Sequence, residues 1–80
     1  MKAIRIYPIR TVYESNVDII GEVEECSIAQ AEEYAVYAVE ELQTHLADFT
    51  CRRAALHLAT TLAEMLGVPL EDSHNLGEAP

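Results

Sequence analysis

Hydrophobic and polar residues alternate at the beginning of the chain with the two-residue period of a β-strand. In residues 3–12 (AIRIYPIRTV), Ile4 and Ile6 alternate with Arg5 and Tyr7. Pro8 has no amide hydrogen to donate to a β-ladder, so we expect this strand to be an edge strand or to be bulged there. Residues 17–25 (VDIIGEVEE) predict a second strand, and the turn residues before them predict that the two strands form a hairpin.

The spacing of apolar residues then lengthens and predicts an amphipathic helix over residues 28–47 (IAQAEEYAVYAVEELQTHLA). Ser27 and Gln30 have the spacing of a capping box, in which Ser27 is the N-cap. One face of this helix would be apolar and consist of Ile28, Ala31, Ala35, Ala38, Leu42 and Leu46. Its other sides would carry Glu32, Glu33, Glu40 and Glu41.

A second helix is predicted over residues 50–66, where the apolar stripe continues in a different phase. The residues from Asp48 to Cys51 are poorer helix formers, and together with the phase change they favour two helices over one. One long helix remains the alternative, because neither glycine nor proline occurs between Glu22 and Leu66. Gly67 suits the left-handed position after a helix, and Pro69 prevents the helix from continuing.

The expected fold class is therefore α+β, with an N-terminal antiparallel β-hairpin followed by two α-helices packed as a helical hairpin against it. Residues 1–70 would form a single small domain, and residues 71–80 a flexible C-terminal tail. Cys26 and Cys51 are not in a CxxC pair, so we expect free, buried thiols, with a disulfide as the alternative. No apolar run approaches the roughly 18 residues of a membrane span, and we expect a cytoplasmic protein.

The charge is unevenly distributed along the chain. The formal net charge is −9, and the segment between Arg10 and Arg52 contains ten acidic residues but no lysine or arginine. This distribution disfavours direct binding to nucleic acid or an anionic membrane, because phosphate contacts require cations. It favours a basic partner, although acidic residues that only keep a small domain soluble are the alternative.

Neither catalysis nor metal binding is indicated by the residues. His45, Cys51 and His57 are spaced by six residues, whereas two ligands on one helix need a spacing of three or four. Cys26 and His74 are the further candidates for such a site. The glutamates of an exposed helix stay solvated and do not acquire the pKa values of acid–base catalysts. We therefore expect no enzyme activity, no cofactor and no metal.

The acidic surface is the candidate binding site. Glu32/Glu33 and Glu40/Glu41 would lie about 12 Å apart along a helix, with Tyr37 beside them as a contact residue. In the hairpin, Arg5 and Arg10 would face Asp18, Glu22 and Glu24 in cross-strand ion pairs. The expected partner-binding residues are Glu22, Glu24, Glu32, Glu33, Glu40, Glu41 and Tyr37.

In general character the chain resembles small phage-encoded anti-CRISPR proteins. The likeness lies in the opening strand MKAIRIYPIR, in the stretch from Thr11 to Cys51 without basic residues, and in the overall length. The resemblance implies a non-enzymatic inhibitor in the cytoplasm of a bacterial host, which binds a CRISPR effector subunit and blocks its nucleic-acid site. The alternatives are a small domain that pairs with a second copy, and a metal-responsive or redox protein that uses the cysteines and histidines.

Overall fold

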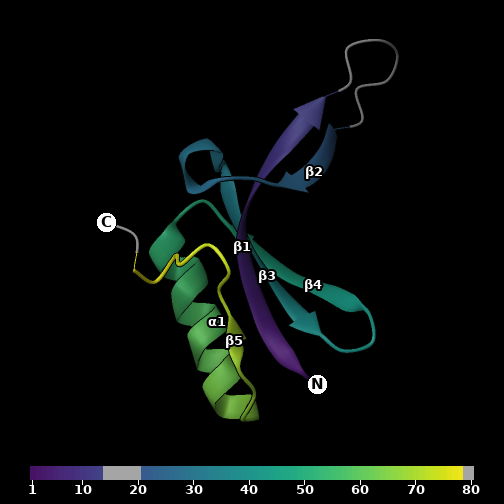
Figure 1. Cartoon of the computed structure of the whole chain (residues 1–80), viewed down its shortest axis with the longest axis vertical. Coiled ribbons are helices and arrows are strands. Elements are labelled where there is room, and N and C mark those ends of the chain that lie inside the picture. Colours follow the sequence, from purple (N-terminus) through teal and green to yellow (C-terminus); the bar gives the residue numbers. More distant parts are fainter. Residues whose placement is uncertain (14–20, 79–80) are drawn as a thin grey trace.

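The chain forms one β-sheet with one α-helix packed across one face, as seen in a computed structural model that describes residues 1–13 and 21–78 (Figure 1). In these residues the strands are β1 (Ala3–Tyr13), β2 (Gly21–Glu25), β3 (Glu33–Val39), β4 (Gln43–Phe49) and β5 (Leu70–Glu71). The helix α1 spans Arg52–Leu66, and the short 3-10 helix η1 spans Ile28–Gln30.

Strand β1 is the centre of the sheet. It pairs antiparallel with β3 on one side, and on its other side it pairs with β2 antiparallel and with the short β5 in parallel. Strand β4 pairs antiparallel with β3 and forms the edge beyond it. Because β1 makes contacts along both sides, its residues fix the positions of most of the other elements.

The hydrophobic core lies between the sheet and α1. Ile4 and Ile6 of β1 and Val36 of β3 are fully buried there against the helix. The helix contributes only small buried side chains, Ala55, Ala59 and Ala63, which allow its backbone to lie close to the sheet. Larger side chains from both layers surround this centre, and Leu76 from the C-terminal segment closes it.

The predicted helix over residues 28–47 is wrong, and with it the predicted helical hairpin. This segment contains η1, β3 and β4. In β3, Val36 and Ala38 lie on the core side and alternate with Ala35 and Tyr37 on the other side, as the strand period requires. The reverse turn between β3 and β4 consists of Glu40, Glu41 and Leu42, and the amide of Glu40 donates to the carbonyl of Leu42.

The second predicted helix corresponds to α1, and its end is as expected. Gly67 adopts a left-handed conformation (φ 65°), and its amide donates to the carbonyl of Glu64 at 3.3 Å. The amide of Val68 donates to the carbonyl of Ala63 at 3.0 Å, which completes the cap. Pro69 follows and ends the helix, and its carbonyl accepts the amide of Ile4.

Pro8 does not make β1 an edge strand, contrary to the prediction, and the register of β1 with β3 is continuous through it. Its carbonyl accepts the amide of Cys26 at 3.1 Å, on the side of β1 where β5 and β2 pair. The nitrogen of an extended residue faces the same side as its carbonyl. The nitrogen of Pro8 therefore points at the gap between β5, which ends at Glu71, and β2, which ends at Glu25. There the missing hydrogen costs no ladder bond.

The segment predicted to be a flexible tail packs onto the domain as far as it is described. Residues 70–71 form β5, and Leu76 is 1% exposed. The carboxylate of Asp72 accepts hydrogen bonds from the amides of Leu76 (2.8 Å) and Gly77 (3.0 Å), which holds this turn closed. Both cysteines are free, but only Cys26 is buried as expected, whereas Cys51 is exposed.

Candidate functional site

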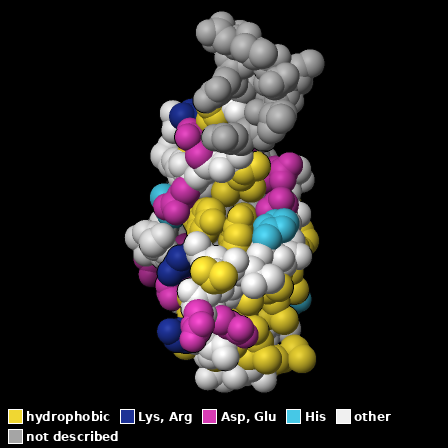
Figure 2. Space-filling view, turned by 90° about the vertical axis from the view of Figure 1, so that its right-hand side faces the viewer, with side chains coloured by type: hydrophobic (Ala, Val, Ile, Leu, Met, Phe, Trp, Pro, Cys, Tyr) yellow, Lys and Arg dark blue, Asp and Glu magenta, His cyan; other side chains and the backbone are white. Residues whose placement is uncertain are grey.

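The face of the sheet opposite α1, called here the open face, carries most of the polar side chains that the strands bring together. Cross-strand partners share a face, so the pairings Arg5–Tyr37, Tyr7–Ala35 and Ile9–Glu25 place these residues on the side opposite Ile4 and Ile6. Helix α1 covers the other side (Figure 1). In the space-filling view from the side away from α1, hydrophobic side chains lie centrally, and acidic side chains lie on both sides of them and below (Figure 2). Lysine and arginine side chains lie along the left of this view.

Aromatic rings occupy the middle of the open face. The rings of Tyr7 and Tyr37 are stacked with their centroids 5.2 Å apart, and the His45 ring meets Tyr37 edge-on at the same distance. His45 in turn contacts Asp48, with 2.7 Å between Nε2 and Oδ1. Burial, followed by the interaction with Tyr37, raises the pKa of the Tyr7 hydroxyl well above its usual range. Tyr7 is therefore a neutral phenol at physiological pH and not a proton acceptor.

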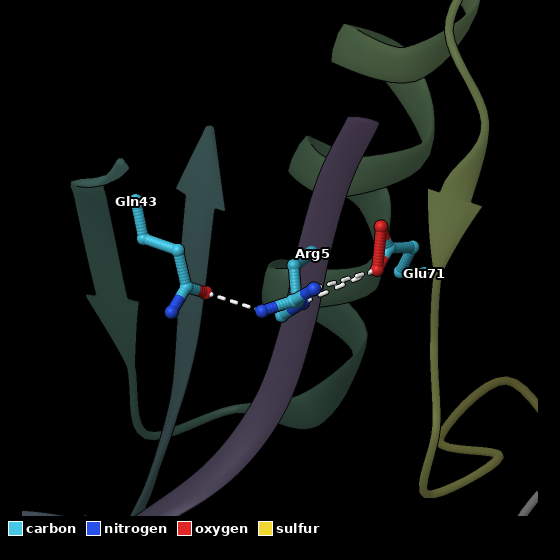
Figure 3. A network of polar contacts seen from close by, with 3 residues as sticks. All are labelled: Arg5, Gln43 and Glu71. Atoms are coloured by element: carbon cyan, nitrogen blue, oxygen red, sulfur yellow. Dashed lines mark hydrogen bonds and ion pairs between the residues drawn. The ribbon is translucent and has the colours of Figure 1, made fainter. Parts of the chain in front are cut away.

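Arg5 lies in the middle strand of the open face, and Glu71 already compensates its charge. Its guanidinium donates to Oε2 of Glu71 through Nη2 (2.8 Å) and Nε (3.3 Å), and to Oε1 of Gln43 through Nη1 at 2.8 Å (Figure 3). These contacts reach from β5 to β4 across the sheet. Both charged groups are more than a third exposed, so the ion pair adds little stability, and its main effect is to position the side chains.

A hollow of about 230 Å³ opens at the end of the open face next to β2. Its lining includes the apolar residues Ile9 and Val23 and the acidic residues Glu32, Glu33 and Asp48. Thr11 and Arg10 complete the lining. Pockets for cofactors or drug-sized ligands occupy about 300–1,000 Å³, so this hollow is too small for such a ligand. It has room for a single side chain of another molecule.

The charged side chains around the hollow differ in whether they already have a hydrogen-bond or ion-pair partner. Arg10 pairs with Glu24 at 2.8 Å, and Oε1 of Glu32 accepts the amide of Thr11 at 2.9 Å. Asp48 contacts His45 through one oxygen. The Glu33 carboxylate has no hydrogen-bond or ion-pair partner among residues 1–13 and 21–78, although its side chain is half-buried. Of the acidic residues that line the hollow, Glu33 and Asp48 thus keep carboxylate oxygens without a partner in the described part of the chain.

The predicted partner-binding residues whose side chains the structure describes lie on different parts of the molecule. Glu33 and Tyr37 lie on the open face, and Glu32 stands at the hollow. Glu40 and Glu41 are exposed in the turn between β3 and β4. Glu24 binds Arg10, which confirms one of the expected cross-strand ion pairs, whereas Arg5 binds Glu71 instead of an acid of β2. The side chain of Glu22, and all of Asp18, lie outside the described residues.

Several residues of the site were missed by the sequence analysis. Ile9, Val23 and Asp48 come from three strands and meet only through the register of the sheet. A signal for the sheet was present in EYAVYAV, where the strand formers tyrosine and valine supply four of the seven residues. Reading that segment as a strand would have placed Glu33 and Tyr37 on one face, opposite Val36.

Other kinds of site find no support in the described residues. Among them, no three His, Cys, Asp or Glu side chains gather in a way that would hold a metal ion. None of the helices in this part of the chain is long and apolar enough to cross a membrane. His74 contacts Glu25 at 2.6 Å instead of joining His45 or Cys51. Burial raises the pKa of the Cys26 thiol, which disfavours its nucleophilic thiolate form.

No family model, curated protein or solved structure matches this chain. The function is therefore inferred from the chain's own geometry.

Proposed function

We propose that the protein is a non-enzymatic interaction protein that binds a basic protein surface through the open face of its sheet. One observation carries this proposal. The strands place Glu25, Glu33, Asp48 and Glu71 on the face that α1 leaves uncovered. The arginines described on this face or lining its hollow, Arg5 and Arg10, are already paired with Glu71 and Glu24. A net charge of −9 extends the attraction beyond these contacts.

The middle of the open face supports the same proposal. Tyrosine side chains are frequent at the centres of protein interfaces, because a large apolar ring is combined there with a polar tip. Tyr7 and Tyr37 are held together by stacking, so little conformational entropy would be lost when a partner covers them. The acidic rim would steer a basic partner, and the rings would supply apolar contact area.

The class of partner follows from the charge. A protein that binds nucleic acid has a basic groove, and an acidic face with carboxylates at several-ångström intervals can occupy it in place of phosphates. A nucleic-acid-binding protein is thus the first partner to test, and inhibition would result from blocking its groove. The resemblance to anti-CRISPR proteins, and not the charge, makes a CRISPR effector subunit one such candidate. On this proposal the binding residues are those of the open face and not a helix surface.

The proposal is tested by capturing partners from bacterial lysate at about 0.1 M and about 0.5 M salt, which differ in electrostatic screening. The test variant combines Glu25→Gln, Glu33→Gln and Asp48→Asn. A control of equal net charge combines Glu41→Gln, Glu64→Gln and Glu78→Gln, which are exposed positions in the turn after β3, in α1 and in the C-terminal segment. We expect the test variant alone to lose nucleic-acid-binding proteins that the wild type captures at low salt. Equal capture by wild type and test variant would refute the proposal.

Pairing with a second copy is a second candidate function, favoured by the edge strand β4. Leu42 is 82% exposed and Leu46 44% exposed at this edge, where β4 pairs only with β3 in the described sheet. Sedimentation would detect a dimer, and Leu46→Lys should dissociate it. Two chains with a charge of −9 each repel one another, and the repulsion is strongest at low salt. We therefore place this function second.

A further inference from the structure

We propose that the hollow at the end of the open face is a binding site for one arginine side chain of the partner. The inference rests on the proposed function and deepens it, because it assigns a specific residue type and a specific place of contact. It starts from the size of the hollow, about 230 Å³, which suits one long side chain better than a cofactor or a drug-sized ligand.

The lining matches the two chemically different parts of such a side chain. Ile9 and Val23 offer apolar surface for the methylene stem. Glu33 and Asp48 offer carboxylate oxygens for the charged head, and they come from neighbouring strands, β3 and β4, and line the same hollow. Long cationic side chains commonly bind with the stem on an apolar surface and the head on a carboxylate.

The arrangement of the acceptors favours arginine over lysine. A guanidinium presents five N–H donors in a planar fork and can bind two carboxylates at once, whereas an ammonium group is a compact and more strongly hydrated point charge. Glu33 has no other partner in the described part of the chain, and Asp48 uses only its Oδ1 for His45. Glu32 adds negative charge beside them, although its Oε1 is already bonded to the amide of Thr11.

Arg10, the chain's own arginine at the hollow, does not neutralise Glu33 and Asp48. Arg10 lines the hollow, but its guanidinium is bound by Glu24 at 2.8 Å, so the carboxylates opposite are not compensated by it. A second copy of this chain is a poor source of the arginine, because it brings a net charge of −9 with it. In a basic partner, the residues around the arginine would also be positively charged and would complement the acidic open face.

The binding experiment uses a short polyarginine peptide as the probe, with a polylysine peptide of equal length for comparison, and measures amide chemical shifts of the full chain by NMR. We expect the largest shifts near Ile9, Val23 and Glu33. The double variant Glu33→Gln/Asp48→Asn should weaken polyarginine binding at least about tenfold, which corresponds to about 1.4 kcal/mol. The control Glu64→Gln/Glu78→Gln, with the same change in net charge, should weaken it much less.

A second pair of variants separates the hollow from the charge of the face. Val23→Trp fills the hollow without altering the charge, and Val23 is 57% exposed, so the larger side chain is expected to be tolerated. Val12→Trp, at an exposed position on the opposite side of β1, is the matched control. We expect only Val23→Trp to abolish the preference for polyarginine over polylysine.

The outcomes distinguish this inference from the proposed function. The hollow is not an arginine site if the two double variants weaken polyarginine binding equally, or if Val23→Trp binds polyarginine as the wild type does. In either case the proposal that an acidic face attracts basic partners still stands. Equal affinity for the two peptides in the wild type would also overturn the choice of arginine. If neither peptide binds at low salt, both proposals fail.

Discussion

The rings of Tyr7 and Tyr37 lie almost parallel, with 13° between their planes and 5.2 Å between their centroids, on the face of the sheet that α1 leaves uncovered. Tyr7 comes from β1 and Tyr37 from β3, so the stack joins two strands by their side chains as well as by their backbones. Each ring covers part of the other. Burial is the first cause of the raised pKa of Tyr7.

The raised pKa predicts how stability depends on pH. The folded state holds the proton of Tyr7 more tightly than the unfolded chain does, whose tyrosines titrate at about 10. Its contribution is therefore complete below about pH 10 and is lost as the pH rises above that value. We expect the free energy of unfolding of the wild type to fall more steeply above pH 10 than that of Tyr7→Phe.

The titration itself is measured by the absorbance of tyrosinate in wild type and Tyr7→Phe. The difference between the two curves isolates one of the four tyrosines of the chain. We expect this difference to appear above pH 10 in the folded protein and to move to about 10 in urea. A difference curve centred at 10 in the folded protein would show that the stack does not bury the hydroxyl.

The two cysteines are expected to differ in reactivity. Cys26 is 9% exposed and burial raises the pKa of its thiol, whereas Cys51 is exposed immediately before α1. Since the thiolate is the reactive form, a thiol reagent should label Cys51 quickly and Cys26 slowly at neutral pH. Cys51→Ser should remove the fast phase, and Cys26→Ser the slow one. Fast labelling of both cysteines in the folded protein would contradict this assignment.

The sequence predicts where α1 and β1 lie along the chain, because the information for both positions is local. The stop at Gly67 and Pro69 and the apolar stripe before it specify α1, and the alternation around Ile4 and Ile6 specifies β1. In β3 the information is ambiguous. Alanines at 31, 35 and 38 fit a helical spacing, while Tyr34 and Val36 fit the two-residue period in which the strand uses them.

The turn between β3 and β4 explains why the ambiguity was resolved wrongly. It is built from Glu40, Glu41 and Leu42, without the glycine, asparagine or proline that usually marks a hairpin. Strand β4 then depends on hydrogen bonds to β3 and on a register shift near Val36, which no local pattern encodes. The hollow was unpredictable for the same reason, since Ile9, Val23 and Asp48 meet only through strand pairing.

The close approach of α1 to the sheet predicts that its central alanine does not tolerate enlargement. Ala59 is fully buried opposite the β1 and β3 side chains of the core. Ala59→Leu should lower the free energy of unfolding by about 1–3 kcal/mol through overpacking, as measured by urea denaturation. Thr60→Leu adds a large side chain to an exposed position of the same helix and should change stability by less than about 0.5 kcal/mol. Equal effects would show that the helix can move away from the sheet.

At the left-handed cap of α1, a substitution tests the backbone conformation of Gly67 without adding a steric clash. Gly67 has φ 65°, and an added Cβ would have no atom within 4 Å, so a substitution there causes no clash. Gly67→Ala should nevertheless cost about 1–2 kcal/mol, because a Cβ disfavours the left-handed region. Gly67→Asn should cost less, since asparagine adopts this conformation more readily.

Gly77→Ala is the matched control for the cap. A Cβ at this position would make ordinary contacts with Asp72 at 3.7 Å and Leu56 at 3.9 Å, and Gly77 lacks a positive φ. Its effect on the unfolding midpoint in urea should therefore be small. If Gly67→Ala and Gly77→Ala shift the midpoint equally, the left-handed cap contributes nothing beyond the ordinary effect of losing a glycine. If only Gly67→Ala shifts it, the end of α1 depends on a backbone conformation that the sequence already indicates by Gly67 and Pro69.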